Sequence, residues 1–275
     1  MRYLADKKIG VIGLGNMGGA IVNGLLSSGA VKKANIIGFD SDAAKRAAAV
    51  KKYGISATTR SILEVAAHCD IVIFAVKPQN IDEVLAEISF YGKNRLYISI
   101  AAGITTRRIE KALARIPKPR VIRVMPNTPA LVGEGISAIC KGRYAAAKDL
   151  KAANEIFSSV GETVNINEKH FDVVTAVSGS GPAYFFYLKE ALIETAVSLG
   201  MDRVTAKRLV SKTALGSARL LIGSGQEPGV LRQRVTSKGG TTEQAIKVFD
   251  RSGMKRIVEK AVAAAVRRSK ELSGE

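Results

Sequence analysis

The sequence predicts an α/β domain with a mostly parallel sheet over residues 1–167, followed by an all-α domain over residues 168–275. Two patterns support this division. In the first part, short apolar runs of strand length alternate with segments of helical periodicity, as in a parallel sheet that has helices on both faces. After about residue 168 the strand pattern stops, and apolar residues recur at helical spacing. The apolar fraction of 47% is enough for a sizeable core.

The first domain contains five predicted strands, at residues 8–13, 35–40, 71–76, 96–100 and 121–124. The helices that alternate with them are expected at residues 16–28, 43–52, 61–67, 81–88, 106–115 and 144–160. A short segment at residues 55–57 is a candidate strand, and segments 136–140 and 162–166 are expected to extend the sheet at its edge.

The first predicted strand runs into a glycine-rich turn that opens a helix, with Gly13, Gly15 and Gly18 in the pattern G-x-G-x-x-G. In a Rossmann-like fold the first glycine permits the tight turn, the second lets the backbone approach a pyrophosphate, and the third brings the helix close to the strand. Unpaired N–H groups at the start of the helix also favour an anion. We therefore expect a dinucleotide-binding loop formed by Gly13, Leu14, Gly15, Asn16, Met17 and Gly18.

Asp40 ends the second predicted strand, about 20 residues beyond the glycine loop. An acid at this place hydrogen-bonds the adenosine ribose and disfavours a 2′-phosphate, which favours NAD. The following Ser41, Lys45 and Arg46 would instead accommodate NADP, so the choice between NADH and NADPH stays open. The alternative is that Asp40 caps the helix whose pattern begins at Ala43.

The later strands also end in residues that suit a ligand site, because ligands of open α/β sheets bind beyond the carboxyl ends of the strands. Ala75, Val76, Lys77 and Pro78 follow the third strand, and we expect them to face the cofactor, although an ordinary strand end gives the same pattern. Residues 99–103 are small and leave room for a ring, and residues 125–129 include two prolines that fix an irregular loop.

In the second domain, residues 183–199 form the most apolar predicted helix. Its apolar residues fall on nearly every face, so it should be buried all round. A domain of roughly 100 residues can scarcely bury such a helix alone, which indicates homodimerisation through it. Amphipathic helices at residues 204–222 and 254–272 are its expected partners.

Two glycine-rich stretches open helices in this domain, at residues 178–182 and 235–242. The second brings Ser237, Gly240, Thr241 and Thr242 to a helix N-terminus, where hydroxyl and N–H groups suit a small carboxylate. Plain N-capping by Ser237 or Thr241 explains the same residues equally well.

Composition argues against several classes of function. The net charge is +18, but Lys and Arg are scattered among acids and aromatics are only 5%, so we expect no nucleic-acid partner. A positive field would instead attract an anionic cofactor and substrate. No uncharged run reaches the ~18 residues of a membrane span, so we expect no membrane association and a cytoplasmic protein.

Cys69 and Cys140 lie in or beside apolar segments, and we expect both to be buried free thiols. Neither these cysteines nor His68 and His170 have the spacing of metal ligands, so no metal site is expected.

Five motifs occur in one order, at residues 13–18, 75–79, 125–129, 178–184 and 235–242. Together they closely resemble the pyrroline-5-carboxylate reductase family, over nearly the whole chain. The resemblance implies NAD(P)H-dependent reduction of the C5=N bond of 1-pyrroline-5-carboxylate to L-proline, the last step of proline biosynthesis.

The resemblance also implies roles for individual residues of the second loop. Thr242 would place its hydroxyl near the ring nitrogen. Ser237 and the backbone N–H groups near Gly240, Thr241 and Thr242 would hold the carboxylate. It further implies intertwined homodimers, often assembled into decamers, with the site built where the helical domain of one subunit meets a nucleotide domain.

The chain departs from the family pattern at two places. Lys238 stands where family members commonly have proline, and Ser61 and Ile62 stand where a cofactor-contacting Asn often begins a helix.

Two rival interpretations fit less well. A β-hydroxyacid dehydrogenase or imine-reductase relative would share the two-domain plan. The hydroxyacid enzymes, however, carry a catalytic Lys four residues after the glycine stretch, where this chain has Phe185. A non-catalytic dinucleotide-sensing protein would keep the first loop but has no need of Ser237, Thr241 and Thr242.

Overall fold

The computed structural model describes residues 4–55, 57–58, 61–91, 93 and 95–273, and the chain divides into two compact units. The first unit runs up to Ser180 and also takes in the chain from Ala265 onward. The second unit is Gly181–Ala264. The expected domain boundary between residues 167 and 168 stays a prediction.

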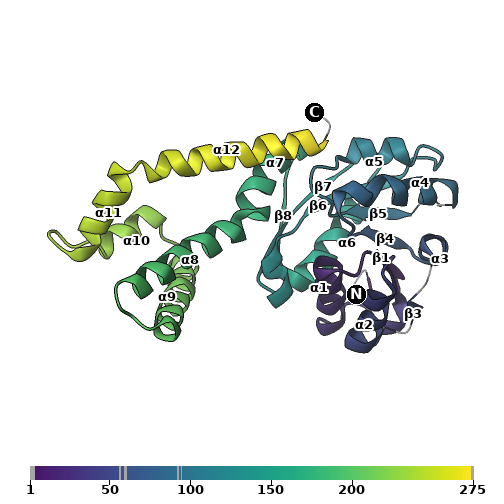
Figure 1. The fold of residues 1–275 in the computed structure, drawn as a ribbon. Coiled ribbons are helices and arrows are strands. Elements are labelled where there is room, and N and C mark those ends of the chain that lie inside the picture. Colours follow the sequence, from purple (N-terminus) through teal and green to yellow (C-terminus); the bar gives the residue numbers. More distant parts are fainter. Residues whose placement is uncertain (1–3, 56, 59–60, 92, 94, 274–275) are drawn as a thin grey trace. The chain divides into compact units, whose positions relative to one another are not determined.

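An eight-stranded sheet with the strand order β3-β2-β1-β4-β5-β6-β7-β8 forms the centre of the first unit (Figure 1). All neighbouring strands are parallel except β6 and β7, which confirms the expectation of a mostly parallel sheet. The strands are β1 Ile9–Ile12, β2 Ile36–Phe39, β3 Ala57–Thr58, β4 Ile71–Phe74, β5 Leu96–Ser99, β6 Arg120–Met125, β7 Gly135–Lys141 and β8 Gly161–Asn165.

Strands β7 and β8 extend the sheet beyond β6, as expected for residues 136–140 and 162–166. The candidate strand at residues 55–57 lies partly outside the described residues, and its last residue, Ala57, is the first residue of β3. β1 and β4 are buried along their whole length. Continuous burial explains their uninterrupted apolar sequences, since both faces of a central parallel strand are covered by helices.

The α-helices that alternate with or follow these strands in the described part of the first unit are α1 Asn16–Ser27, α2 Ala43–Tyr53, α3 Ile62–His68, α4 Ile81–Tyr91, α5 Thr106–Ala112, α6 Ala147–Phe157 and α7 Phe171–Val174. Two of them, α5 and α6, are shorter than expected by three or more residues. α6 begins only at Ala147, because the Asp149 carboxylate accepts a hydrogen bond from the Ala146 N–H and fixes the start of the helix there (2.8 Å). α5 ends at Ala112, and Pro117 follows within two turns.

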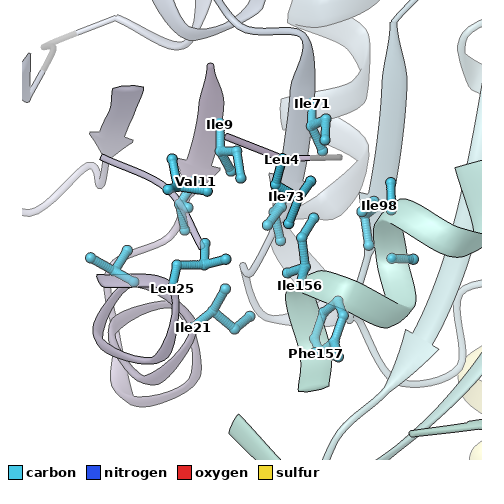
Figure 2. Packing of buried hydrophobic residues seen from close by; sticks show 14 of the residues in the cluster. Leu4, Ile9, Val11, Ile21, Leu25, Ile71, Ile73, Ile98, Ile156 and Phe157 are labelled. Atoms are coloured by element: carbon cyan, nitrogen blue, oxygen red, sulfur yellow. The ribbon is translucent and has the colours of Figure 1, made fainter. Parts of the chain in front are cut away.

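Alternate strand residues supply two separate cores. Ile9 and Val11 of β1 pack with helices α1 and α6 on one face, as Figure 2 shows. Val72 and Phe74 of β4 pack with α3, α4 and α5 on the other face. This is the period-two alternation of strands that are covered on both sides. The parallel pairing of β2, β1, β4 and β5 places their carboxyl ends at one shared edge.

The second unit is helical, with α8 Gly181–Ser198, α9 Arg203–Ser224, α10 Pro228–Arg234, α11 Thr241–Arg251 and the first part of α12 Met254–Ser273. α8 packs against α9. In the single chain, Phe185 and Tyr187 of α8 are 75% and 74% exposed, so this chain alone does not bury the helix all round. Among the described residues, no helix is both long enough and apolar enough to cross a membrane.

The last turns of α12 belong to the first unit. The Ser269 hydroxyl donates to Asp172 Oδ1 at 2.6 Å. Leu272 lies against Gly103, whose φ of +75° and lack of space exclude a side chain. The C-terminal helix therefore ends on the loop that follows β5.

Candidate active site

A cavity of about 700 Å³ opens at the carboxyl ends of β1, β2 and β4. We call it the strand-end cavity. Eight of the predicted cofactor residues line it: Gly13, Gly15, Asn16, Met17, Asp40, Ala75, Val76 and Lys77. Leu14, Gly18 and Pro78 are not among its lining residues. These residues come from three segments of the chain: the glycine loop, the end of β2 and the end of β4. The sheet topology brings the three segments together at one edge of the sheet.

The glycine loop has a distinct geometry at each glycine. Gly13 has φ +99°, which only glycine adopts readily. A Cβ on Gly18 would clash with the Gly13 carbonyl oxygen, so α1 lies close against the turn. At Gly15 a Cβ would meet no protein atom within 4 Å. Gly15 is also the N-cap of α1, and no side chain among the described residues caps that helix. Open space beside uncapped N–H groups is the arrangement that a pyrophosphate needs.

Asp40 is 9% exposed, and both of its carboxylate oxygens accept backbone hydrogen bonds. Oδ2 accepts from the Leu14 N–H at 2.8 Å and Oδ1 from the Asp42 N–H at 3.0 Å. The alternative that Asp40 caps the following helix is wrong, because the N-cap of α2 is Asp42, which accepts from Ala44 N–H and Lys45 N–H. Asp40 instead joins β2 to the glycine loop.

The cationic groups near Asp40 differ in their contacts. Arg46 donates from Nη1 to the carbonyl oxygens of Asp40 (2.5 Å) and Ser41 (3.2 Å). Ser41 and Lys45 line the strand-end cavity. The Lys45 ammonium is 4.0 Å from the carboxylate of Asp42. A lysine and a hydroxyl therefore face the same space as the Asp40 carboxylate.

Sequence patterns missed one wall of this cavity. Asn80, Glu83, Val84 and Glu87 line it from the start of α4 and the turn before it. Glu83 and Glu87 are one helical turn apart, so the spacing of four residues was a usable signal for a shared face. Which face of the helix meets the strand ends is decided by the packing of α4 on the sheet.

The loop after β6 is tied to the stretch that precedes α8. Asn127 Oδ1 accepts from the Ile136 N–H at 3.0 Å, and Asn127 Nδ2 donates to Ser178 Oγ at 3.4 Å. Residues Thr175–Gly179 form a π-helical turn, and a Cβ on Gly179 would clash with the Met125 side chain. π-turns recur at functional sites. Two of the sequence motifs are thus in direct contact.

The second glycine loop lies in the helical unit and forms a type II turn. The Gly240 N–H donates to the Ser237 carbonyl oxygen at 3.0 Å, and Gly239 has φ +74°. The N-cap of α11 is Gly240 without a side-chain cap. N-capping by Ser237 or Thr241 is therefore wrong. Thr241 and Thr242 form the first turn of α11, and the hydroxyls of this loop remain at an open helix N-terminus.

Glu243 is a further residue that holds this loop. Its Oε2 accepts from the Gly239 N–H at 2.9 Å and lies 3.2 Å from the Lys247 ammonium. These two partners lower the pKa of the Glu243 carboxyl below its ordinary value. The signal in the sequence was a glutamate three residues after the N-cap, the position of a capping box.

The two cysteines are buried and free, as expected. Burial raises the pKa of both the Cys69 and the Cys140 thiol to about 12. Thiols in this state are poor nucleophiles and poor metal ligands.

Two family models match the chain. The model described as pyrroline-5-carboxylate reductase dimerisation matches residues 168–272, and the model described as NADP oxidoreductase coenzyme F420-dependent matches residues 8–103. Pyrroline-5-carboxylate reductase of Methanosarcina acetivorans is 41% identical over 270 residues, which are 98% of this chain and 99% of the relative.

This chain belongs to the pyrroline-5-carboxylate reductase family.

Two solved structures of this reductase family resemble the chain over nearly its whole length. The pyrroline carboxylate reductase of Plasmodium falciparum, solved with NADP bound, has a TM-score of 0.87 at 34% identity and covers 98% of this chain and 99% of its own. The pyrroline-5-carboxylate reductase of Coxiella burnetii has a TM-score of 0.88 at 38% identity, with 97% and 98% covered. The reductase-family fold thus extends through both compact units.

Proposed function

We propose that this protein is an NAD(P)H-dependent reductase that converts 1-pyrroline-5-carboxylate to L-proline. The observation that carries the proposal is the pairing of two glycine loops in one reductase-family chain. One loop opens onto the strand-end cavity, and the other forms a helix N-terminus that has no side-chain cap among the described residues.

The strand-end cavity fits a nicotinamide dinucleotide. Gly15 leaves open space beside the uncapped start of α1, which suits the pyrophosphate. Ala75, Val76 and Lys77 border the same cavity from the end of β4. When bound, the reduced cofactor supplies the hydride. The chain contributes binding and orientation, which is the usual role of the protein in such reactions.

The second loop is proposed to bind the substrate. The Ser237 hydroxyl and the N–H groups of Gly240, Thr241 and Thr242 bind the carboxylate, supported by the helix dipole of α11. The Thr242 hydroxyl donates a hydrogen bond to the ring nitrogen and favours the charge that the nitrogen carries. A cyclic imine is readily protonated, so most of the rate enhancement comes from orienting the imine against the cofactor. A histidine that donates a proton is not required.

The cofactor preference depends on opposing groups in one cavity. The Asp40 carboxylate hydrogen-bonds the ribose hydroxyls of NADH, whereas Lys45 and Ser41 favour the 2′-phosphate of NADPH. Both cofactors belong to the proposal.

We also infer a homodimer through the helical unit, with a decamer as the higher assembly. The exposed aromatic side chains of α8 support this, because contiguous apolar surface of this kind marks an interface. A cytoplasmic compartment is part of the same proposal, and the free buried thiols of Cys69 and Cys140 support it.

Purified protein should oxidise NADH or NADPH when pyrroline-5-carboxylate is added and should form L-proline in equal amount. Gly15→Val should raise the KM for the cofactor while leaving the melting temperature unchanged, because a Cβ at this position meets no protein atom within 4 Å and Gly15 lines the cavity. Gly216→Val in α9, where a Cβ also meets no protein atom within 4 Å, is the matched control. Absence of turnover with both cofactors would reject the proposed function.

A further inference from the structure

A second cavity, of about 350 Å³, lies at the opposite end of the sheet, and we call it the basal cavity. Ile71 and Leu96, the first residues of β4 and β5, line it. Ala75 and Val76, which follow β4, line the strand-end cavity instead. The basal cavity is therefore separate from the proposed cofactor site, and the proposed reaction does not use it.

The walls of the basal cavity are strongly basic. Five basic and two acidic side chains line it, an excess of three positive charges: Lys7, Lys93, Arg95, Arg120 and Lys148 against Asp70 and Asp149. A low-dielectric wall around like charges focuses the field into the cavity and attracts anions.

Both acids are already engaged by the protein. Asp149 is fully buried, with Oδ1 accepting from Arg120 Nη1 at 2.7 Å and Oδ2 from the Ala146 N–H at 2.8 Å. Asp70 Oδ2 accepts from the Lys8 N–H at 2.9 Å. These carboxylates hold the fold together at β4 and α6, and they balance only part of the positive charge.

Arg95 supplies a fixed charge that its partners leave uncompensated. Its guanidinium donates from Nη1 to the Cys69 carbonyl oxygen and from Nη2 to the Ala67 carbonyl oxygen, at the end of α3. Neutral carbonyl groups orient the guanidinium without neutralising it. Its Nε–H is buried and has no hydrogen-bond partner among the described residues. Buried donors of this kind call for an acceptor.

Lys148 adds to the same field from the first turn of α6. A cation there lies at the positive end of the helix dipole, which is the unfavourable end for it. An anion bound between Lys148 and Arg95 would offset the unfavourable position of the Lys148 ammonium and would give the Arg95 Nε–H an acceptor.

We propose that the basal cavity binds a small oxyanion with at least two negative charges, of the phosphate class. A single carboxylate would leave most of the positive charge uncompensated. A tetrahedral oxyanion offers acceptors to a guanidinium and to ammonium groups at once. The site is a small cavity at the ends of strands with two acidic side chains in its wall, so it suits a small anion rather than a nucleic-acid strand.

Calorimetric titration of sodium diphosphate, with sodium phosphate as a second arm, tests the proposal. NADPH is kept saturating to occupy the strand-end cavity, and sodium chloride keeps the ionic strength constant. Wild-type protein should bind diphosphate more tightly than phosphate. Lys148→Ala and Lys93→Ala should each weaken diphosphate binding about 10-fold or more, as for the loss of a charge-assisted hydrogen bond.

Lys151→Ala is the matched control, because Lys151 is exposed on the same helix and does not line the basal cavity. Alanine favours a helix at both positions, so both variants should fold. Equal affinities of Lys148→Ala and Lys151→Ala would place the binding elsewhere and overturn the proposal. Absence of binding by both anions would overturn it too. Because these variants leave the two glycine loops intact, they should retain reductase activity, which separates this test from that of the proposed function.

Discussion

The carboxylate of Asp40 accepts a hydrogen bond from the backbone N–H of Leu14, with 2.8 Å between Asp40 Oδ2 and Leu14 N. This bond joins the end of β2 to the middle of the glycine loop, 26 residues apart. The same buried carboxylate lines the strand-end cavity. Asp40 therefore shapes the loop and also borders the cavity that we propose for the cofactor.

Replacement of Asp40 by serine should shift the ratio of kcat/KM values for NADH and NADPH toward NADPH. The change removes a negative charge that would repel a 2′-phosphate and leaves Lys45 beside it. Steady-state kinetics with both cofactors measure the ratio. Asp42→Ser removes the same charge two residues away and retains a good N-cap for α2, so it should leave the ratio unchanged. An unchanged ratio in Asp40→Ser would limit Asp40 to its structural role.

Thr242→Ala should lower kcat about 10- to 100-fold, because a hydrogen bond to a charged group contributes roughly 1.5–3 kcal/mol. Thr242→Ser should restore most of the rate, since it returns the hydroxyl to the first turn of α11. Measurement of kcat and KM separately distinguishes this role from carboxylate binding, which would appear chiefly in KM. A Thr242→Ala enzyme with wild-type kcat would remove the hydroxyl from the mechanism.

Lys238→Pro should stabilise the protein by about 0.4–1 kcal/mol. Lys238 occupies the second position of the type II turn from Ser237 to Gly240, where proline is favoured. Its N–H donates no backbone hydrogen bond among the described residues, so nothing is lost there. Chemical denaturation measures the gain, and Lys238→Ala separates the loss of charge from the stiffer backbone. Destabilisation by proline would mean that the loop requires another conformation.

The carboxylate of Glu243 should make the stability of the second glycine loop depend on acid pH. Its pKa in the folded protein is lowered by the Gly239 N–H and Lys247, so its contribution is complete above the ordinary value of 4.5. The contribution is lost as the pH falls through the lowered value. The melting temperatures of wild type and Glu243→Gln should differ near neutral pH and converge in acid. Glu259→Gln, at an exposed position of α12, is the control. A difference that persists at low pH would assign the effect to packing.

The glycine loop shows which features of local backbone geometry can be predicted from the sequence alone. Gly13, Gly15 and Gly18 were assigned to a turn, an open approach and a close packing, and the backbone has these features. Such features depend on which φ and ψ values a residue allows, and that is a property of the residue itself. The same holds for the apolar strands and helices, whose periodicity follows from the geometry of one segment.

Contacts between residues that are far apart in the chain could not be predicted from the sequence. Glu83 and Glu87 reach the strand-end cavity only because α4 packs on the sheet in one orientation. The five basic residues of the basal cavity come from four separate segments, and only the strand order brings them together.

The sequence by itself determined the parallel sheet, the helical second part, the two glycine loops and the family, because each depends on local backbone preference or on a short motif. The tertiary structure decided that Asp42 rather than Asp40 caps α2, that Asp40 holds Leu14, and that two cavities lie at opposite ends of one sheet. These facts depend on hydrogen bonds and packing between residues far apart in the chain, which are fixed only when the strands take their order.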